Sequence, residues 1–230
     1  MIHQKNEDNT QDLFTKITES YAQLTNTPLQ EAKKYKKGAL IFKQGAIPRG
    51  VYYIRSGWVK IFKIGADGNE KILRLVTMNQ FIGYLSLIKR WNFRSSAIAV
   101  TDCEVYFIPK QIFLTLLAKD NNFAALVVEM LADELAESET HIDTLLCKNV
   151  QERLTNLLLG LEQASDSNAD YDDSLIRLPK KELAGIINIT PETLSRHLMT
   201  LEGDGLINNN IKHIELLNRS GLLKKSNLRD

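Results

Sequence analysis

The sequence predicts an α+β fold, with a small antiparallel β jelly roll first, a long helix next and a compact helical unit last. Three observations predict it. Short strand-like segments separated by glycine or turn residues fill residues 37–108. An apolar repeat typical of a helix then extends from Leu131 to Leu145. Two short helices with a tight turn between them are expected from Lys180 to Glu202.

Composition sets the broad class of protein. The chain has 230 residues, of which 43% are hydrophobic, enough for two modest domains with their own cores. Its net charge of +1 argues against a polycation that coats nucleic acid indiscriminately. The first ten residues carry no apolar signal core, and no apolar run reaches 18 residues. We therefore expect a soluble, cytoplasmic protein without a membrane partner.

The segment before the strands is expected to be mainly helical. Residues 1–12 are predicted to form a loose polar arm. A helix follows, and its apolar side chains at helical spacing are Leu13, Phe14, Ile17, Tyr21 and Leu24. Thr27-Pro28 ends this helix, and a short basic helix is predicted over 29–36.

The predicted jelly roll consists of seven short strands. They are expected at 40–43, 51–54, 58–64, 71–76, 81–83, 95–100 and 104–108. The segment from Gly65 to Asn69 is a hairpin-turn signal between two of them. Both cysteines, Cys103 and Cys147, lack paired spacing and are predicted to be small buried residues in a reducing compartment.

The long helix carries a heptad seam, Leu131, Leu135, Ser138, Ile142 and Leu145. A narrow stripe of this kind favours a partner helix, so a homodimer is predicted; the alternative is a helix that lies on the roll. The seam ends at Lys148. Asn149 and Glu152 then form the pattern of a capping box, which predicts a new helix and a hinge. The predicted domains are therefore 1–120, a dimerisation helix at 121–148, and 149–230.

The second helix of the C-terminal pair is predicted to present polar side chains outward. Thr190 suits the N-cap, and Pro191 suits the first helical position. The apolar face consists of Leu194, Leu198 and Leu201, and the opposite face of Glu192, Ser195, Arg196 and Met199. Two strands around a turn, over 206–216, would form a wing beside this pair.

These elements, in this order, resemble the CRP/FNR superfamily of bacterial transcription regulators over about residues 20–225. The most specific motif is Lys181-Glu182-Leu183-Ala184, followed by Glu192-Thr193-Leu194-Ser195-Arg196. The resemblance implies a roll similar to a cyclic-nucleotide-binding domain and a winged helix-turn-helix that binds double-stranded DNA. Glu-x-x-Ser-Arg resembles the FNR branch, which implies palindromic sites with TTGAT-like halves.

The resemblance and the chemistry together nominate a DNA-binding set. Its members are Lys180, Lys181, Thr190, Glu192, Thr193, Ser195, Arg196 and Lys212. Arginine can form two hydrogen bonds with guanine, and glutamate can accept one from cytosine. Lysines contact phosphates and set the register. The alternative is that Glu192 and Arg196, four residues apart, only form a surface ion pair.

The resemblance also implies an effector site. Its candidate residues are Gly83, Tyr84, Leu85, Arg94, Ser95 and Ser138. A guanidinium and a hydroxyl at 94 and 95 suit a phosphate. Tyr84 stands where the family has a glutamate for the ribose, which argues against cyclic AMP. A small anionic effector, another cyclic nucleotide, no ligand, and a purely structural salt bridge of Arg94 all remain open.

Metal and cofactor chemistry is only weakly indicated. The N-terminus has no cysteine cluster, so the iron–sulfur centre of the FNR branch is not expected. His3 and His141 leave a haem-based gas sensor open as an alternative. We find no nucleophile–base constellation or metal-ligand spacing, so no enzyme activity and no metal site are predicted.

The leading hypothesis is therefore a homodimeric, sequence-specific transcription regulator switched by an effector in the roll. RNA polymerase would be a further partner if the protein activates transcription. The alternative from another class is an effector-sensing module that acts through protein contacts, with the winged helix as a docking surface.

Overall fold

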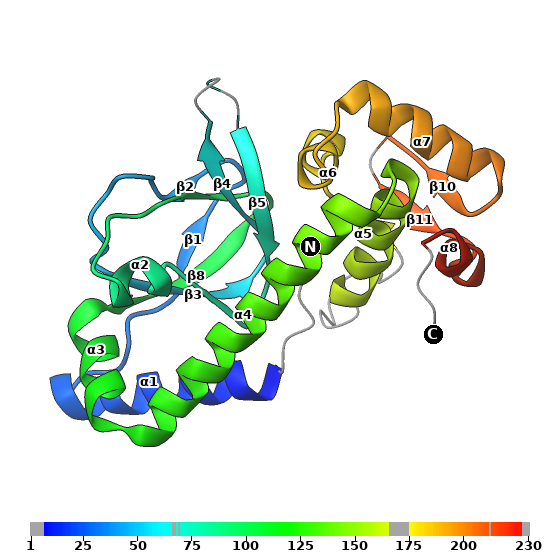
Figure 1. Ribbon diagram of the computed structural model, residues 1–230. Helices are drawn as coiled ribbons and strands as arrows, with labels where there is room; N and C mark the ends of the chain where they lie inside the picture. The colour runs from blue at the N-terminus through cyan, green and yellow to red at the C-terminus, as the bar shows by residue number, and fades with distance from the viewer. Residues whose placement is uncertain (1–6, 66–67, 69, 166–174, 212, 227–230) are drawn as a thin grey trace. The chain divides into compact units, whose positions relative to one another are not determined.

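The computed structural model describes residues 7–65, 68, 70–165, 175–211 and 213–226, and it divides the chain into two compact units. The first unit covers residues 5–136. Its elements are α1 (Glu7–Thr25), β1 (Lys33–Tyr35), β2 (Leu40–Phe42), β3 (Gly50–Ser56), β4 (Val59–Ile64), β5 (Glu70–Val76), β6 (Gln80–Ile82), α2 (Tyr84–Ile88), β7 (Ser96–Ala99), β8 (Cys103–Pro109), α3 (Lys110–Lys119) and the first part of α4 (Asn121–Cys147) (Figure 1).

Two four-stranded antiparallel sheets form the roll of the first unit. One sheet has the order β1-β8-β3-β6, and the other has the order β2-β7-β4-β5. The predicted hairpin is present, because Ile64 of β4 pairs with Glu70 of β5. Residues 66, 67 and 69 of that turn lie outside the described residues. The predicted α+β fold, with an antiparallel roll, a long helix and a C-terminal helix-turn-helix, is confirmed.

The interior of the roll receives apolar side chains from both sheets. Ile54 of β3 and Ile82 of β6 are fully buried there, together with Phe42 of β2 and Ile61 of β4. Phe93, from the loop before β7, stacks on Phe42 with ring centroids 4.1 Å apart. Burial of these side chains between the sheets is the main stabilising contribution to the roll.

A second core lies on the other face of β3. Alternate residues of a strand point to opposite faces, so Val51 and Tyr53 face away from the roll interior. They pack with fully buried side chains of α1, α3 and α4, among them Ile17, Phe113 and Phe123. This core attaches the start of the long helix to the roll.

The N-terminal predictions were partly wrong. Helix α1 begins at Glu7, within the segment that was predicted to be a loose arm, and residues 1–6 lie outside the described residues. The basic helix predicted over 29–36 is also wrong. Lys33–Tyr35 forms β1 instead, and it pairs with residues 103–105 of β8. A pairing partner 70 residues away overrides the local helical tendency.

The second unit contains the rest of α4 and the C-terminal elements. These are α5 (Val150–Ser165), β9 (Leu175–Ile176), α6 (Lys180–Ile186), α7 (Pro191–Gly203), β10 (Ile207–Asn209), β11 (Ile214–Leu216) and α8 (Arg219–Ser226) (Figure 1). The three strands form one antiparallel sheet in the order β10-β11-β9. The predicted polar loop after α5 falls largely at 166–174, which lie outside the described residues.

The start of α5 is capped as the sequence indicated. Asn149 Oδ1 accepts a hydrogen bond from the backbone N–H of Glu152 at 3.0 Å, and the Glu152 carboxylate accepts one from the N–H of Asn149 at 2.8 Å. This reciprocal pair ends α4 and starts α5 within three residues, because it satisfies backbone donors that a helix N-terminus otherwise leaves free.

The cysteines differ in their surroundings. Cys103 is buried, as predicted, and burial raises the pKa of its thiol to about 11. Cys147 is exposed, so the prediction that it is buried was wrong. Cys147 is the last residue of α4, and no described residue of the second unit buries its side chain.

Candidate nucleic-acid interface and effector site

Helix α7 is held by its apolar face and presents its polar face to solvent. Leu194, Leu198 and Leu201 are each 0% exposed. Thr190 caps the helix, because its hydroxyl oxygen accepts a hydrogen bond from the backbone N–H of Thr193 at 3.3 Å. Asn188 turns the chain between α6 and α7 with a positive φ of 56°. The buried leucines and the turn at Asn188 therefore fix the direction in which the polar face of α7 points.

The predicted base-reading side chains are all exposed on that face. Glu192, Ser195 and Arg196 lie on the outer side of α7. Arg196 Nη2 donates a hydrogen bond to Thr193 Oγ1 at 3.4 Å, and Ser195 Oγ donates one to the carbonyl of Pro191 at 2.9 Å. Among the described residues, Glu192 and Arg196 form no ion pair with each other. Both charges are therefore available to a partner.

The Glu192 carboxyl group is kept ionised by its place at the helix start. A hydrogen bond from its own backbone N–H, and then one from the Thr190 hydroxyl, hold its pKa below the usual range. An ionised carboxylate is the form that accepts a hydrogen bond from an amino group. Glu192 can thus act as an acceptor at neutral pH.

The remaining members of the predicted DNA-binding set lie around α7. Lys180 and Lys181 open α6, where Lys181 is exposed. Lys212, which lies between β10 and β11 in the sequence, is outside the described residues. In that turn, the N–H of Asn210 donates to the carbonyl of His213 at 3.0 Å, and Ile211 is fully exposed. Sequence reasoning did not single out Ile211 as a candidate contact residue. Its full exposure at the tip of the wing is the feature that marks it.

The predicted effector residues have different surroundings, and five of the six belong to the first unit. Gly83 ends β6 with a φ of 88°, and a Cβ placed there would lie 3.1 Å from the ring of Phe93. Tyr84 is only 1% exposed and packs in the second core, outside the roll interior. Its hydroxyl is buried and has no hydrogen-bond partner among the described residues. Leu85 is exposed on α2.

Arg94 is exposed and stacks on an aromatic ring. Its guanidinium carbon lies 5.0 Å from the ring centroid of Trp91, and Lys89 Nζ lies 5.4 Å from the same centroid. Arg94 forms no ion pair with any residue that the structure describes. Ser95 beside it is half-buried, whereas Ser138 is exposed on α4 within the second unit.

The loop that carries Arg94 is hydrogen-bonded to the turn that follows β2. The N–H of Gly45 donates to the carbonyl of Phe93 at 2.8 Å, and the N–H of Phe93 donates to the carbonyl of Ala46 at 2.9 Å. The Phe93 ring therefore occupies the roll interior beside Gly83, while the next residue, Arg94, faces solvent.

Two observations bear on membranes and metals. None of the described helices combines the length and the apolar character needed to cross a bilayer. His141 is half-buried, and burial lowers the pKa of its imidazole. Within the described ranges, no three His, Cys, Asp or Glu side chains gather in a way that could hold a metal ion.

Comparisons with known families define the class of this protein. The family model for the cyclic nucleotide-binding domain matches residues 32–120, and that for the Crp-like helix-turn-helix domain matches residues 152–225. The protein is thus a transcription regulator with a helix-turn-helix DNA-binding domain.

Individual relatives agree with this class. The chain is 27% identical over 177 residues to the cyclic AMP receptor protein of Thermus thermophilus, a match that spans 77% of this chain and 79% of that one. It is 25% identical to the fumarate and nitrate reduction regulatory protein of Vibrio cholerae over 90% of this chain and 83% of that one. Its fold resembles that of FixK2 from Bradyrhizobium japonicum, with a TM-score of 0.76, 21% identity, and coverage of 89% and 100% of the two chains. The chain belongs to the CRP/FNR superfamily.

Proposed function

We propose that this regulator binds palindromic DNA as a homodimer and reads it with α7. The observation that carries this proposal is the division of α7 into a fully buried leucine face and an exposed face with Glu192, Ser195 and Arg196. A helix anchored in this way can enter the major groove without losing its packing.

The exposed groups fit the edges of a guanine·cytosine pair and the phosphates around it. Arg196 would donate two hydrogen bonds to guanine O6 and N7, and Glu192 would accept one from cytosine N4. The TTGAT-like half-site contains one such pair, and it is proposed here because of the Glu-x-x-Ser-Arg pattern. Lys180, Lys181 and Lys212 would contact phosphates, and the hydroxyls of Thr190 and Thr193 lie at the helix start, where they would do the same.

The homodimer is supported by an apolar stripe along α4 that the chain leaves exposed. Its side chains include Val128, Leu135, Ile142 and Leu146, which are 63%, 62%, 56% and 79% exposed. The first three are spaced by seven residues, which is the repeat of a two-stranded coiled coil. A second copy of the chain would cover this stripe and place two α7 helices for two half-sites.

The proposed effector site retains only part of the predicted set. Arg94 and Ser95, with Gly83 just before α2 and Leu85 on it, could bind an anionic group that draws the guanidinium away from Trp91. Tyr84 packs in a core and offers no ribose contact, so its burial argues against cyclic AMP. A role for Ser138 in that site stays a proposal.

We place the regulator in the cytoplasm, with RNA polymerase as a partner if it activates transcription. We assign it no catalytic step.

The test is binding to a duplex with two TTGAT-like half-sites whose centres lie about 34 Å apart. Fluorescence anisotropy should give tighter binding to this duplex than to one with scrambled half-sites. Affinity for both should fall steeply with salt, because phosphate contacts release counterions. Equal affinity for the two duplexes, or no dependence on salt, would contradict the proposal and favour docking to a protein.

A further inference from the structure

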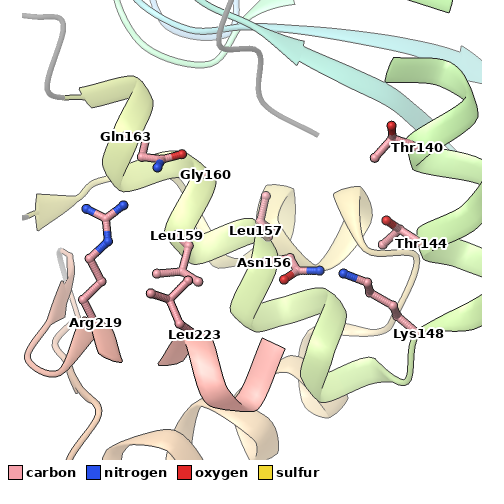
Figure 2. Close-up of a pocket in the computed structure, with 10 residues that line it drawn as sticks. All are labelled: Thr140, Thr144, Lys148, Asn156, Leu157, Leu159, Gly160, Gln163, Arg219 and Leu223. Atoms are coloured by element: carbon pink, nitrogen blue, oxygen red, sulfur yellow. The ribbon is translucent and has the colours of Figure 1, made fainter. Parts of the chain in front are cut away.

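A cavity of about 210 Å³ lies inside the second unit, away from the α7 surface. It opens between the last turns of α4, the middle of α5 and the start of α8 (Figure 2). Its polar lining residues are Thr140, Thr144, Lys148, Asn156, Gln163 and Arg219. The first three recur every four residues, so they share one face of α4 and its end.

Two polar groups in this cavity have no hydrogen-bond partner among the described residues. Asn156 Oδ1 is buried and accepts no hydrogen bond from any described residue. Thr144 is only 5% exposed, and its hydroxyl makes no hydrogen bond within the part of the chain that the structure describes. Buried polar atoms are nearly always hydrogen-bonded, so Asn156 Oδ1 is open to a ligand, and the Thr144 hydroxyl is also available to one.

Among the described residues that line the cavity, one positive charge has no ion-pair partner within the described part of the chain. Arg219 is partly neutralised by Glu162, whose carboxylate lies 3.6 Å from its guanidinium. Lys148 has no ion-pair partner among the described residues. Figure 2 shows its side chain extending from the end of α4 toward Asn156. A carboxylate beside Lys148 would form a charge-assisted hydrogen bond in a partly desolvated site.

The remaining lining residues of the cavity are apolar. Leu157 and Leu159 are buried, and Leu223 of α8 lies beside Leu159 in Figure 2. Gly160 adds no side chain at this point of α5, which leaves room for a ligand. The volume of about 210 Å³ favours a small ligand.

We propose that this cavity binds a short aliphatic carboxylic acid with a hydrogen-bond donor on the carbon next to the carboxylate. Lys148 binds the carboxylate, Asn156 Oδ1 accepts the hydrogen bond from the donor, and the leucines contact the aliphatic part. An α-amino acid and a 2-hydroxy acid share this chemistry. Thr144 supplies a second hydrogen bond to the carboxylate.

A ligand here would join the end of α4 to α5 across the capped turn at Asn149. If α7 reads DNA as proposed above, such a ligand would also fix the angle between α4 and the DNA-binding elements. Binding itself does not depend on that function, so it is measured without DNA.

The test is isothermal titration calorimetry of the full chain with four probes of similar size. L-valine and 2-hydroxyisovalerate should bind, isovalerate should bind more weakly because it lacks the donor, and valinamide should not bind because it lacks the carboxylate. Lys148→Met should weaken the affinity for L-valine at least about tenfold, since it removes a charge-assisted hydrogen bond. Lys224→Met, which removes an exposed lysine of α8, should leave the affinity unchanged.

Several results would overturn the proposal. The first is that neither L-valine nor 2-hydroxyisovalerate gives saturable binding. The second is that Lys148→Met and Lys224→Met bind L-valine equally. Equal binding of isovalerate and L-valine would remove the role of Asn156 as acceptor. Thermal melting followed by circular dichroism should show that both variants are folded, so a lost signal reports the site.

Discussion

Asn149 and Glu152 cap each other at the start of α5, through hydrogen bonds of 3.0 and 2.8 Å between each side chain and the other residue's backbone N–H. Removing the Asn149 side chain should lower the free energy of unfolding by about 1 kcal/mol, because the N–H of Glu152 loses its acceptor. Urea denaturation measures this. Asn149→Ser, which keeps a capping oxygen, should recover most of the loss; equal losses for Ala and Ser would contradict the capping role.

Local interactions of this kind were predictable from the sequence. The caps at Asn149 and Thr190 each depend on residues three apart, and the leucines of α7 follow a helical period, so the residue types alone indicated them. The N-termini of α5 and α7 are therefore predictable from the sequence alone.

Features that depend on distant partners were not predictable. The Lys33–Tyr35 segment becomes a strand only because residues 103–105 pair with it. Tyr84 follows a positive-φ glycine that turns its ring into the second core, and no periodicity shows this. Helix α8 was overlooked because it is short and has one strongly buried apolar side chain, Leu222.

The α4 stripe predicts a change of oligomeric state. Leu135 is 62% exposed and stands in the centre of the stripe. Leu135→Lys should convert the proposed dimer to a monomer, because a charge would be buried in the apolar seam of the proposed coiled coil. Sedimentation velocity measures the mass. Asp133→Lys places the same side chain two residues away, off the stripe, and should remain dimeric; a dimer in both variants would exclude this seam.

The burial of Tyr84 predicts that a glutamate cannot be restored there. Tyr84→Glu should lower the free energy of unfolding by about 3–5 kcal/mol, since it places an unpaired carboxylate in the second core. Chemical denaturation checks this. Tyr84→Phe removes a hydroxyl that has no partner among the described residues, so it should be nearly neutral. Stable Tyr84→Glu protein that binds cyclic AMP would contradict the packing described here.

Cys103 predicts a loss of stability at alkaline pH. Its thiol has a pKa of about 11 because it is buried, against an ordinary value of 9.0. The unfolded chain ionises first as pH rises, so the free energy of unfolding should fall from about pH 9 toward pH 11. Urea denaturation across this range measures the slope, and Cys103→Ala should flatten it. The same slope in both proteins would show that other groups cause it.

The most direct measurement of the central claim, that α7 reads DNA through Arg196, uses Arg196→Ala and Arg196→Lys. Anisotropy compares a TTGAT palindrome with the same duplex in which the guanine is replaced. Arg196→Ala should lose about 1–3 kcal/mol of binding free energy on the palindrome and little on the duplex without the guanine. Arg196→Lys should lose selectivity while keeping its charge, because it lacks the two-pronged guanidinium. Unchanged affinity, or equal losses on both duplexes, would contradict the claim.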